Sequence, residues 1–225
     1  MAQATNYYAW LAQYFRPQLN GLVVEHGAGT GLLSFRLHAA GVAPLILTEP
    51  DSALVAGLRG KFAGLDRLEI YTGTLDGFLA ERGEGVADAV ISANVLEHVA
   101  DDAGCLRAIC RTLKPGGHLC LYVPARPELF GSLDRAFHHH RRFRRGELLE
   151  KLSAAGLSPI KVRYRNAANV LPWWIMGRLL GRETLNLRHV RFYDRYFFPW
   201  LKRLEDLVPP PYGLNLLALA QKPAG

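Results

Sequence analysis

The sequence predicts an α/β fold whose central sheet is doubly wound, mostly parallel and built from about seven strands. Short apolar runs alternate with helical patterns of about ten residues, as in strand–helix–strand crossover units. A glycine-rich turn follows the first apolar run, where a parallel sheet places its ligand-binding loops. Apolar residues make up 49% of the 225 residues and charged residues 21%, which indicates a globular chain and excludes extensive disorder.

The apolar runs and helical patterns follow one another along the whole chain. The helix predicted over 102–113 ends at the stop signal 114–117, which reads Lys-Pro-Gly-Gly. The helix predicted over 146–155 stops at Gly156. The predicted strands cover 22–24, 45–47, 68–71, 86–92, 118–123, 158–164 and 214–220, and the other predicted helices cover 6–18, 32–40 and 52–62.

The second half of the chain is less regular. Residues 125–143 lack periodicity and predict a long loop with a short helix. Residues 166–213 are rich in Trp, Tyr and Phe, and predict a helical insert between the sixth and seventh strands. We therefore expect one domain over 1–225, with a core at 20–125, a segment at 126–156 that covers the site, and the insert as a cap.

Positive charge is concentrated in one stretch. Residues 126–203 contain 17 Lys and Arg against 6 Asp and Glu, and they account for the net charge of +7. Such a stretch could meet nucleic acid, an anionic membrane surface or an anionic substrate, and it could also be a solvated face without a partner. No apolar run reaches the ~18–20 residues needed to span a bilayer, and no secretory signal is visible, so we expect a cytoplasmic protein.

The residues after the first predicted strand form the motif Glu-His-Gly-Ala-Gly-Thr-Gly at 25–31. Glycine lets the backbone turn sharply and approach a ligand closely. The spacing differs from the Gly-x-Gly-x-x-Gly fingerprint of dinucleotide-binding proteins. Glu25, two residues before the first glycine, is unfavourable beside a pyrophosphate and favours a ligand that carries an amino group.

Three further motifs follow in order. Glu49 ends the second predicted strand, 18 residues beyond Gly31, where a carboxylate can accept hydrogen bonds from both hydroxyls of a ribose. Residues 92–99, Ser-Ala-Asn-Val-Leu-Glu-His-Val, come after the fourth predicted strand. Residues 113–117, Leu-Lys-Pro-Gly-Gly, precede the fifth.

In this order and spacing, residues 23–31, 49–50, 94–99 and 113–117 resemble the successive motifs of class I S-adenosylmethionine-dependent methyltransferases. The likeness is strongest to the small-molecule branch that includes ubiquinone-biosynthesis O-methyltransferases. It covers residues 20–125 well and extends more loosely to about 160. The resemblance implies a Rossmann-like fold, S-adenosylmethionine as cofactor and S-adenosylhomocysteine as product.

The resemblance also implies roles for individual residues. Glu25 would face the methionine ammonium group, indirectly or through water, and Glu49 would bind the ribose diol. Two positions depart from the family pattern: His26 stands where a small or apolar residue is usual, and Thr74 follows Gly73 where Asp is common, so Asp76 could supply that carboxylate. The remaining implied cofactor contacts are Gly27, Ala28, Gly29, Gly31, Pro50, Thr74, Leu75 and Asn94, with Asn94 near the sulfonium.

Aromatic residues before the first strand and histidines after the fifth complete the predicted site. Tyr7, Tyr8 and Trp10 would form a lid over the cofactor or pack in the core. Residues 138–143 resemble a His-x-Arg-x-aromatic signature of many relatives, matched by His139, Arg141 and Phe143. A histidine can serve as a general base near neutral pH, so His139 and Arg141 are the catalytic candidates.

Other roles are open for the residues at 138–143. They could instead bind an anionic group or tie the loop to Glu147. Consecutive histidines cannot easily converge on one ion, and the three cysteines form no ligand pattern, so we expect no metal.

Together these features predict a methyltransferase that acts on a small or lipid-linked acceptor, anionic or apolar, with oxygen favoured over nitrogen or carbon as the acceptor atom. The apolar segment at 170–180 could be a cap or a homodimer contact, and residues 170–203 could lie on a membrane surface. A nucleic-acid methyltransferase is the first alternative, but residues 94–97 lack the Asn/Asp-Pro-Pro-Tyr/Phe motif of base amino methylation, so we do not expect nucleic acid as partner. A catalytically inactive protein that binds the cofactor and assembles with a partner is the second.

Overall fold

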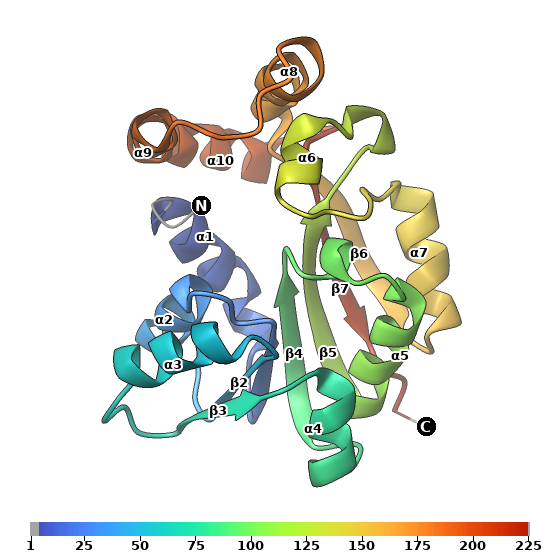
Figure 1. Ribbon diagram of the computed structural model, residues 1–225. Coiled ribbons are helices and arrows are strands. Elements are labelled where there is room, and N and C mark those ends of the chain that lie inside the picture. Colours follow the sequence, from blue (N-terminus) through green and yellow to red (C-terminus); the bar gives the residue numbers. More distant parts are fainter. Residues whose placement is uncertain (1–4, 225) are drawn as a thin grey trace.

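The computed structural model describes residues 5–224 and confirms the predicted sheet (Figure 1). Its seven strands lie in the order β3-β2-β1-β4-β5-β7-β6. All neighbours pair in parallel except β7, which is antiparallel to both β5 and β6. The strands are β1 (Val23–His26), β2 (Leu45–Glu49), β3 (Leu68–Thr72), β4 (Ala87–Ala93), β5 (Leu113–Pro124), β6 (Ser158–Arg165) and β7 (Asn215–Gln221).

Helices cover both faces of the sheet. The helices α1, α2 and α3 pack on one face, and α4, α5 and α7 pack on the other (Figure 1). Successive strand residues point to opposite faces, so Val23 and Leu45 enter the first core whereas Val24 and Ile46 enter the second. The helices are α1 (Thr5–Phe15), α2 (Leu32–Ala39), α3 (Ser52–Lys61), α4 (Leu75–Arg82), α5 (Asp102–Thr112), α6 (Ser132–Ala136), α7 (Arg145–Ala154), α8 (Val170–Trp174), α9 (Leu187–Tyr196) and α10 (Phe198–Leu207).

The sequence pattern did not predict α4. The helix is short and contains a glycine, which weakens its helical signal. Thr74 caps its first turn by accepting a hydrogen bond from the Gly77 N–H, and three side chains at helical spacing, Leu75, Phe78 and Leu79, are buried. Tertiary burial therefore stabilises a helix that local propensity leaves undecided.

The predicted stop at 114–117 is an irregular beginning of β5 instead of a free turn. Pairing with β4 shifts register here, because Ala87 lies opposite Leu113 while Ala89 lies opposite His118. Gly116 has a φ of +80°, which favours glycine, and the Lys114 ammonium is 2.8 Å from the Asp88 carboxylate. The helix ends as predicted, but the chain joins the sheet at once.

The insert forms helices, as expected, and lies beyond the carboxyl ends of the parallel strands (Figure 1). The buried Asp194 of α9 joins it to the first helix of the chain. Its two carboxylate oxygens accept hydrogen bonds from the backbone N–H groups of Asn6 and Tyr7, each at 2.9 Å. A carboxylate at a helix N-terminus accepts hydrogen bonds from N–H groups that have no partner within the helix. Its negative charge also interacts favourably with the helix dipole.

We predict that Asp194→Ala lowers the free energy of unfolding by about 1–3 kcal/mol, because two N–H donors lose the buried carboxylate that accepts from them at a partly buried junction. Urea unfolding measures the change. Asp66→Ala, at an exposed position, is the control and should change stability by less than about 0.5 kcal/mol. Equal stability of both variants would contradict the inferred role of Asp194.

Candidate cofactor and active site

The glycine-rich turn follows β1, which pairs with β2 on one side and with β4 on the other. The turn therefore lies between the carboxyl ends of β2 and β4. The N–H groups of Gly27 and Ala28 both donate to the Thr48 carbonyl, at 2.9 and 3.1 Å, which fixes the turn against β2. Strand order reverses between β1 and β4, and in open α/β sheets this is where ligands bind.

Two of the glycines are required by close packing, and one lies beside open space. A Cβ on Gly27 would come within 2.6 Å of the Val95 side chain, and one on Gly31 within 2.6 Å of Leu58. A Cβ on Gly29 would meet nothing within 4 Å. All three have positive φ angles, of +72°, +74° and +55° respectively. The middle of the turn can therefore be approached by a ligand.

Glu49 lies directly beside this turn. Its Oε2 accepts a hydrogen bond from the Gly29 N–H at 2.8 Å, and its Oε1 accepts one from the Asp51 N–H at 3.1 Å. The side chain is 6% exposed. Each carboxylate oxygen can accept a further hydrogen bond, so Glu49 can hold hydroxyl groups of a ligand while it supports the turn. Pro50 follows it and is exposed.

Glu25 is a buried acid that lacks a full set of partners. Its Oε2 has no hydrogen-bond partner among the described residues, and the residue is 3% exposed. Burial, with a further contribution from the charge of Glu49, raises the pKa of Glu25 to about 8. An unpaired buried carboxyl group is costly unless a ligand supplies a cation or donor. This chemistry fits the ammonium group of S-adenosylmethionine.

His26 lies beneath the turn, as expected for a packed histidine. Its Nδ1 is 3.1 Å from the Ser92 Oγ, and its Nε2 is 4.0 Å from the Cys105 Sγ. Burial lowers the pKa of His26 to about 4, so the ring is neutral at physiological pH.

Asn94 follows β4 and faces the first helix. Its φ is +55°, and its backbone N–H donates to the Tyr122 carbonyl at 2.8 Å. Its amide Nδ2 donates to the Tyr7 hydroxyl at 3.0 Å, and Tyr7 packs against Tyr8 and Phe198. The first helix is thus both packed in the molecule and in contact with a predicted cofactor residue.

Thr74, Leu75 and Asp76 begin α4 close to the backbone of Glu49, whose carbonyl accepts a hydrogen bond from the Gly73 N–H at 3.0 Å. Leu75 is buried in the core, 3% exposed. Asp76 is exposed and lies 4.0 Å from Arg111. Its carboxylate is therefore mainly open to solvent, with Arg111 at the limit of ion-pair distance.

The loop after β5 holds a second cluster around the buried Asp134. Its Oδ1 is 2.9 Å from His139 Nδ1 and 2.7 Å from Arg142 Nε. Burial opposes ionisation, but the hydrogen bond from His139 and the charge of Arg142 hold the pKa of Asp134 below its usual range. A neutral His139 that donates from Nδ1 to Asp134 leaves its Nε2 free to accept a proton.

Glu97 and His98 lie on the other side of His139, and the sequence did not predict a role for either. His139 Nε2 is 4.0 Å from Glu97 Oε1, and the His98 and His139 rings lie 4.9 Å apart, edge to face. Glu97 is buried, its Oε2 has no hydrogen-bond partner in the described part of the chain, and burial raises its pKa to about 8. One ligand atom from each residue lies within 4.8 Å of the others, a donor set of the kind that metals accept. Glu97 and His98 belong to the motif at 92–99, and this motif is the feature of the sequence that could have identified them as site residues.

Arg141 lies near this cluster but binds the protein. Its guanidinium donates to the Ala100 carbonyl and lies 2.9 Å from the Asp102 carboxylate of α5. Arg141 therefore joins the loop to α5. The alternative that the residues at 138–143 tie the loop to Glu147 does not hold for Arg141. Glu147 accepts from the Arg144 N–H at 3.3 Å instead.

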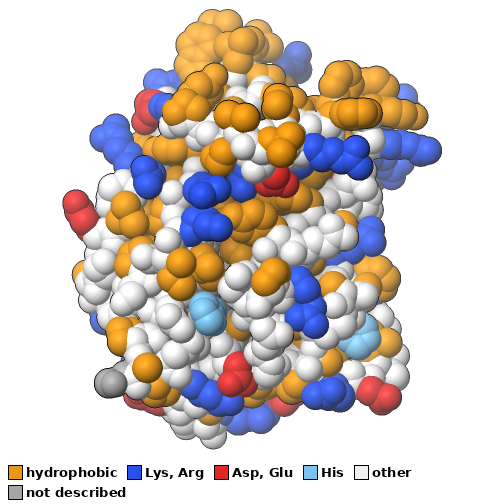
Figure 2. Space-filling model, turned by 180° about the vertical axis from the view of Figure 1, so that it is seen from behind, with side chains coloured by type: hydrophobic (Ala, Val, Ile, Leu, Met, Phe, Trp, Pro, Cys, Tyr) orange, Lys and Arg blue, Asp and Glu red, His pale blue; other side chains and the backbone are white. Residues whose placement is uncertain are grey.

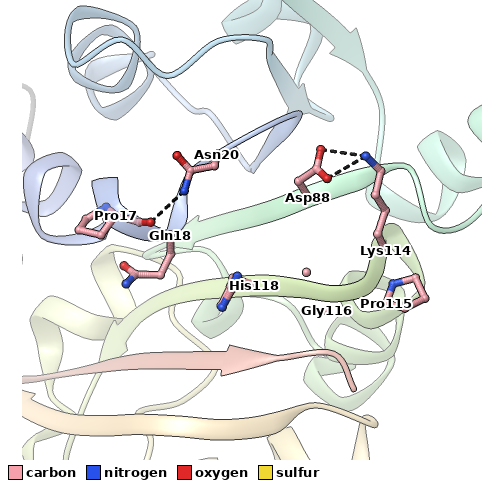
Figure 3. A pocket seen from close by; sticks show the side chains of 9 residues that line it. Pro17, Gln18, Asn20, Asp88, Lys114, Pro115, Gly116 and His118 are labelled. Carbon is pink, nitrogen blue, oxygen red and sulfur yellow. Dashed lines mark hydrogen bonds and ion pairs between the residues drawn. The ribbon is translucent and has the colours of Figure 1, made fainter. Parts of the chain in front are cut away.

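A cavity of about 380 Å³ opens at the other end of the sheet (Figure 3). It is lined by residues at the amino ends of β4 and β5, including the ion pair between Asp88 and Lys114. Ligands of doubly wound sheets bind at the carboxyl ends, so this cavity lies away from the predicted site. The motif at 113–117 borders it and shapes the beginning of β5.

Comparison with known proteins agrees with this geometry. Residues 24–121 match the family model described as a methyltransferase domain. The chain is 30% identical over 179 residues to the ubiquinone biosynthesis O-methyltransferase of Xanthomonas oryzae pv. oryzae, covering 73% of this chain and 72% of that protein. It is 32% identical over 170 residues to the protein of the same name from Ralstonia nicotianae, covering 68% and 69%.

Solved structures share the fold at low sequence identity. A geranyl diphosphate methyltransferase in complex with S-adenosylmethionine superposes with a TM-score of 0.67 at 15% identity, covering 97% of this chain and 85% of that one. An S-adenosylmethionine-dependent methyltransferase from Archaeoglobus fulgidus gives 0.64 at 15%, covering 97% and 94%. With its fold, its ordered motifs and these relatives, the chain belongs to the class I S-adenosylmethionine-dependent methyltransferases and is an enzyme that uses this cofactor.

Proposed function

We propose that this enzyme transfers a methyl group to an oxygen atom of a small or lipid-linked acceptor, anionic or apolar, and that the cofactor lies against the glycine turn and the adjoining Glu49. The observation that carries this placement is the pair of buried carboxyl groups beside one open turn. Glu49 is hydrogen-bonded to Gly29, while Glu25 has an oxygen that no described residue pairs with. A ligand with two hydroxyls and an ammonium group matches both.

In this proposal each predicted residue has a separate task. Glu25 accepts the ammonium group, and the backbone at Gly27, Gly29 and Gly31 lines the amino-acid and ribose part. Glu49 accepts the ribose hydroxyls. The adenine is bordered by Pro50 and by Thr74, Leu75 and Asp76 at the start of α4. Ala28 belongs to the turn. Asn94 lies near the sulfur. When bound, the cofactor supplies a methyl group on a positively charged sulfur, which leaves as a neutral thioether.

The loop after β5 would serve the acceptor. Methyl transfer forms an oxygen–carbon bond as the sulfur–carbon bond breaks, and the acceptor hydroxyl must lose its proton. His139 is held by Asp134 in the tautomer that leaves Nε2 as a base, and Glu97 lies next to that nitrogen. We assign His139 as the candidate base and Arg141 as a positioning residue, because both of its contacts are to the protein.

Oxygen is the favoured acceptor atom because relatives at 30–32% identity are named O-methyltransferases. A nucleic-acid substrate is less well supported, because part of the basic stretch pairs with groups inside the protein. Arg142 and Arg165 are buried, and Arg141 and Lys151 both pair with Asp102. A protein that binds the cofactor without turning it over would release no S-adenosylhomocysteine with any acceptor.

We predict that Glu49→Ala weakens S-adenosylhomocysteine binding by about 1–3 kcal/mol, because charge-assisted hydrogen bonds to the ribose and to Gly29 are lost. Isothermal titration calorimetry measures the affinity. Glu150→Ala, an exposed acid on α7, is the matched control and should bind as the unmodified enzyme does. Undiminished affinity of the Glu49 variant would refute the ribose assignment.

We predict that cofactor binding releases protons below about pH 8. In the free enzyme burial raises the pKa of Glu25 to about 8, whereas an ammonium group favours the ionised carboxylate and lowers that pKa again. Affinity should therefore rise as the pH increases from about 6 toward 8. Calorimetry in buffers of different ionisation enthalpy counts the protons. Glu25→Gln should abolish its share of the release, and an unchanged proton count in that variant would contradict the assignment.

We predict that His139→Asn lowers kcat by about 10²–10⁴-fold and leaves S-adenosylhomocysteine affinity unchanged, because a base acts on the acceptor and not on cofactor binding. Activity is measured as S-adenosylhomocysteine release with a panel of phenols and carboxylic acids, each with and without an isoprenoid chain. His140→Asn, at an exposed neighbouring position, is the control. A parallel loss in cofactor affinity would instead indicate a structural role.

A further inference from the structure

The exposed apolar side chains of the molecule are concentrated on the insert. Among the described residues, thirteen of the fifteen large hydrophobic side chains that are exposed lie between 171 and 212, and the other two are Phe35 and Ile160. Figure 2 shows hydrophobic side chains gathered at one end of the molecule, with Lys and Arg side chains beside them. We call the outward side of α8, α9 and α10, with the turn that joins α8 to α9, the insert surface.

The exposure follows helical spacing, so it is a continuous face and not a scatter of single residues. On α10 and the residue after it, Trp200, Leu204, Leu207 and Val208 are 72%, 60%, 82% and 68% exposed. Residues 200, 204 and 207 lie on one side of the helix. The opposite side of α10 carries Phe198, Lys202 and Glu205, which are all buried. The apolar side of α10 is thus the side that the rest of the protein leaves uncovered.

Helix α9 presents aromatic and basic side chains side by side. Phe192 and Tyr196 are 57% and 55% exposed, one helical turn apart. Arg188, Arg191 and Arg195 are exposed at a spacing that places them on one side of the helix. The inward side of α9 carries Asp194, which binds the first helix.

The net charge of the insert surface is positive because its acids are turned inward. Between residues 170 and 208 six arginines are exposed, and only Glu183 and Asp206 are exposed acids. Asp194 and Glu205 are buried, and Glu205 accepts from the backbone at Asn166 and Ala167 and pairs with Lys202. The exposed arginines are 178, 182, 188, 191, 195 and 203.

We propose that the insert surface binds the surface of an anionic phospholipid bilayer. Arginine forms hydrogen-bonded pairs with phosphate, and exposed Leu and Trp side chains at the same level would enter the boundary between headgroups and acyl chains. No helix within residues 5–224 is long and apolar enough to cross a membrane, so the helices would lie in the plane of the interface.

Charge distinguishes this occupant from two others. A second copy of the chain, docked symmetrically on the same face, would bring arginines toward arginines with few acids to offset them. Nucleic acid would match the arginines but not the aliphatic Leu171, Leu179, Leu180, Leu204 and Leu207, which are 58–82% exposed. An anionic bilayer offers a partner to both kinds of side chain.

The position of the surface adds a consequence that rests on the proposed function. The insert adjoins the loop with His139, because the Trp173 ring lies 4.7 Å from the Arg142 guanidinium and its Nε1 is 3.4 Å from Asp134. A lipid-linked acceptor taken from the bilayer would then arrive at the end of the sheet where the cofactor turn lies. Binding to the bilayer itself does not require this acceptor.

Vesicle flotation with the full chain tests the proposal. The protein should float with vesicles of phosphatidylcholine mixed with phosphatidylglycerol, and much less with phosphatidylcholine alone or at high salt. The double variant Leu204→Glu, Leu207→Glu should lower the affinity at least about tenfold, because two apolar anchors are lost and two like-signed charges face the lipid. Arg191→Glu with Arg195→Glu should remove the preference for the anionic vesicles.

Matched controls keep the result interpretable. Phe35→Glu and Ile160→Glu introduce the same charge at exposed apolar positions outside the insert and should float as the unmodified protein does. Calorimetry with S-adenosylhomocysteine on every variant confirms folding and reports the cofactor site separately from lipid binding.

Three results would overturn the proposal. They are no flotation of the unmodified protein with anionic vesicles, equal loss in the control variants, or light scattering that shows a dimer broken by the Leu204 and Leu207 changes while vesicles do not bind.

Discussion

The cofactor region depends on the hydrogen bond between the Gly29 N–H and the Glu49 carboxylate. This bond exists because β1 and β2 pair in parallel, which brings the residues after both strands to one edge of the sheet. Close packing of Gly27 and Gly31 leaves no room for a side chain there, so the backbone itself forms the wall. The buried Glu25 behind it is a carboxyl group whose Oε2 has no partner within residues 5–224.

The buried acids of the site differ in how completely they are hydrogen-bonded. Asp134 is surrounded by donors from His139 and Arg142 and stays ionised, so the loop after β5 has a fixed arrangement. Glu25 and Glu97 each have an oxygen without a partner among residues 5–224, and burial raises the pKa of both. Paired acids hold the structure, whereas incompletely paired acids mark places where a ligand or a proton can be accepted.

The insert connects the far end of the chain to the cofactor edge. Asp194 holds the beginning of α1, and Tyr7 in that helix accepts a hydrogen bond from Asn94 after β4. The Lys202 ammonium lies 3.6 Å from the centre of the Trp10 ring, which adds a cation–π contact to the same junction. The inward side of the insert is thus well partnered, in contrast to its outward side.

The sequence by itself determined the strands of the sheet, the glycine turn and the position of Glu49 at the end of the second strand. Apolar runs, glycine spacing and acids at strand ends are local signals. The sequence also identified the aromatic, basic insert. Only the tertiary structure decided that α4 forms, that Arg141 pairs with Asp102 and that Glu97 and His98 lie beside His139. These outcomes depend on which side chains are brought together from distant segments and on burial, which shifts pKa values. Neither is encoded in the spacing of neighbouring residues.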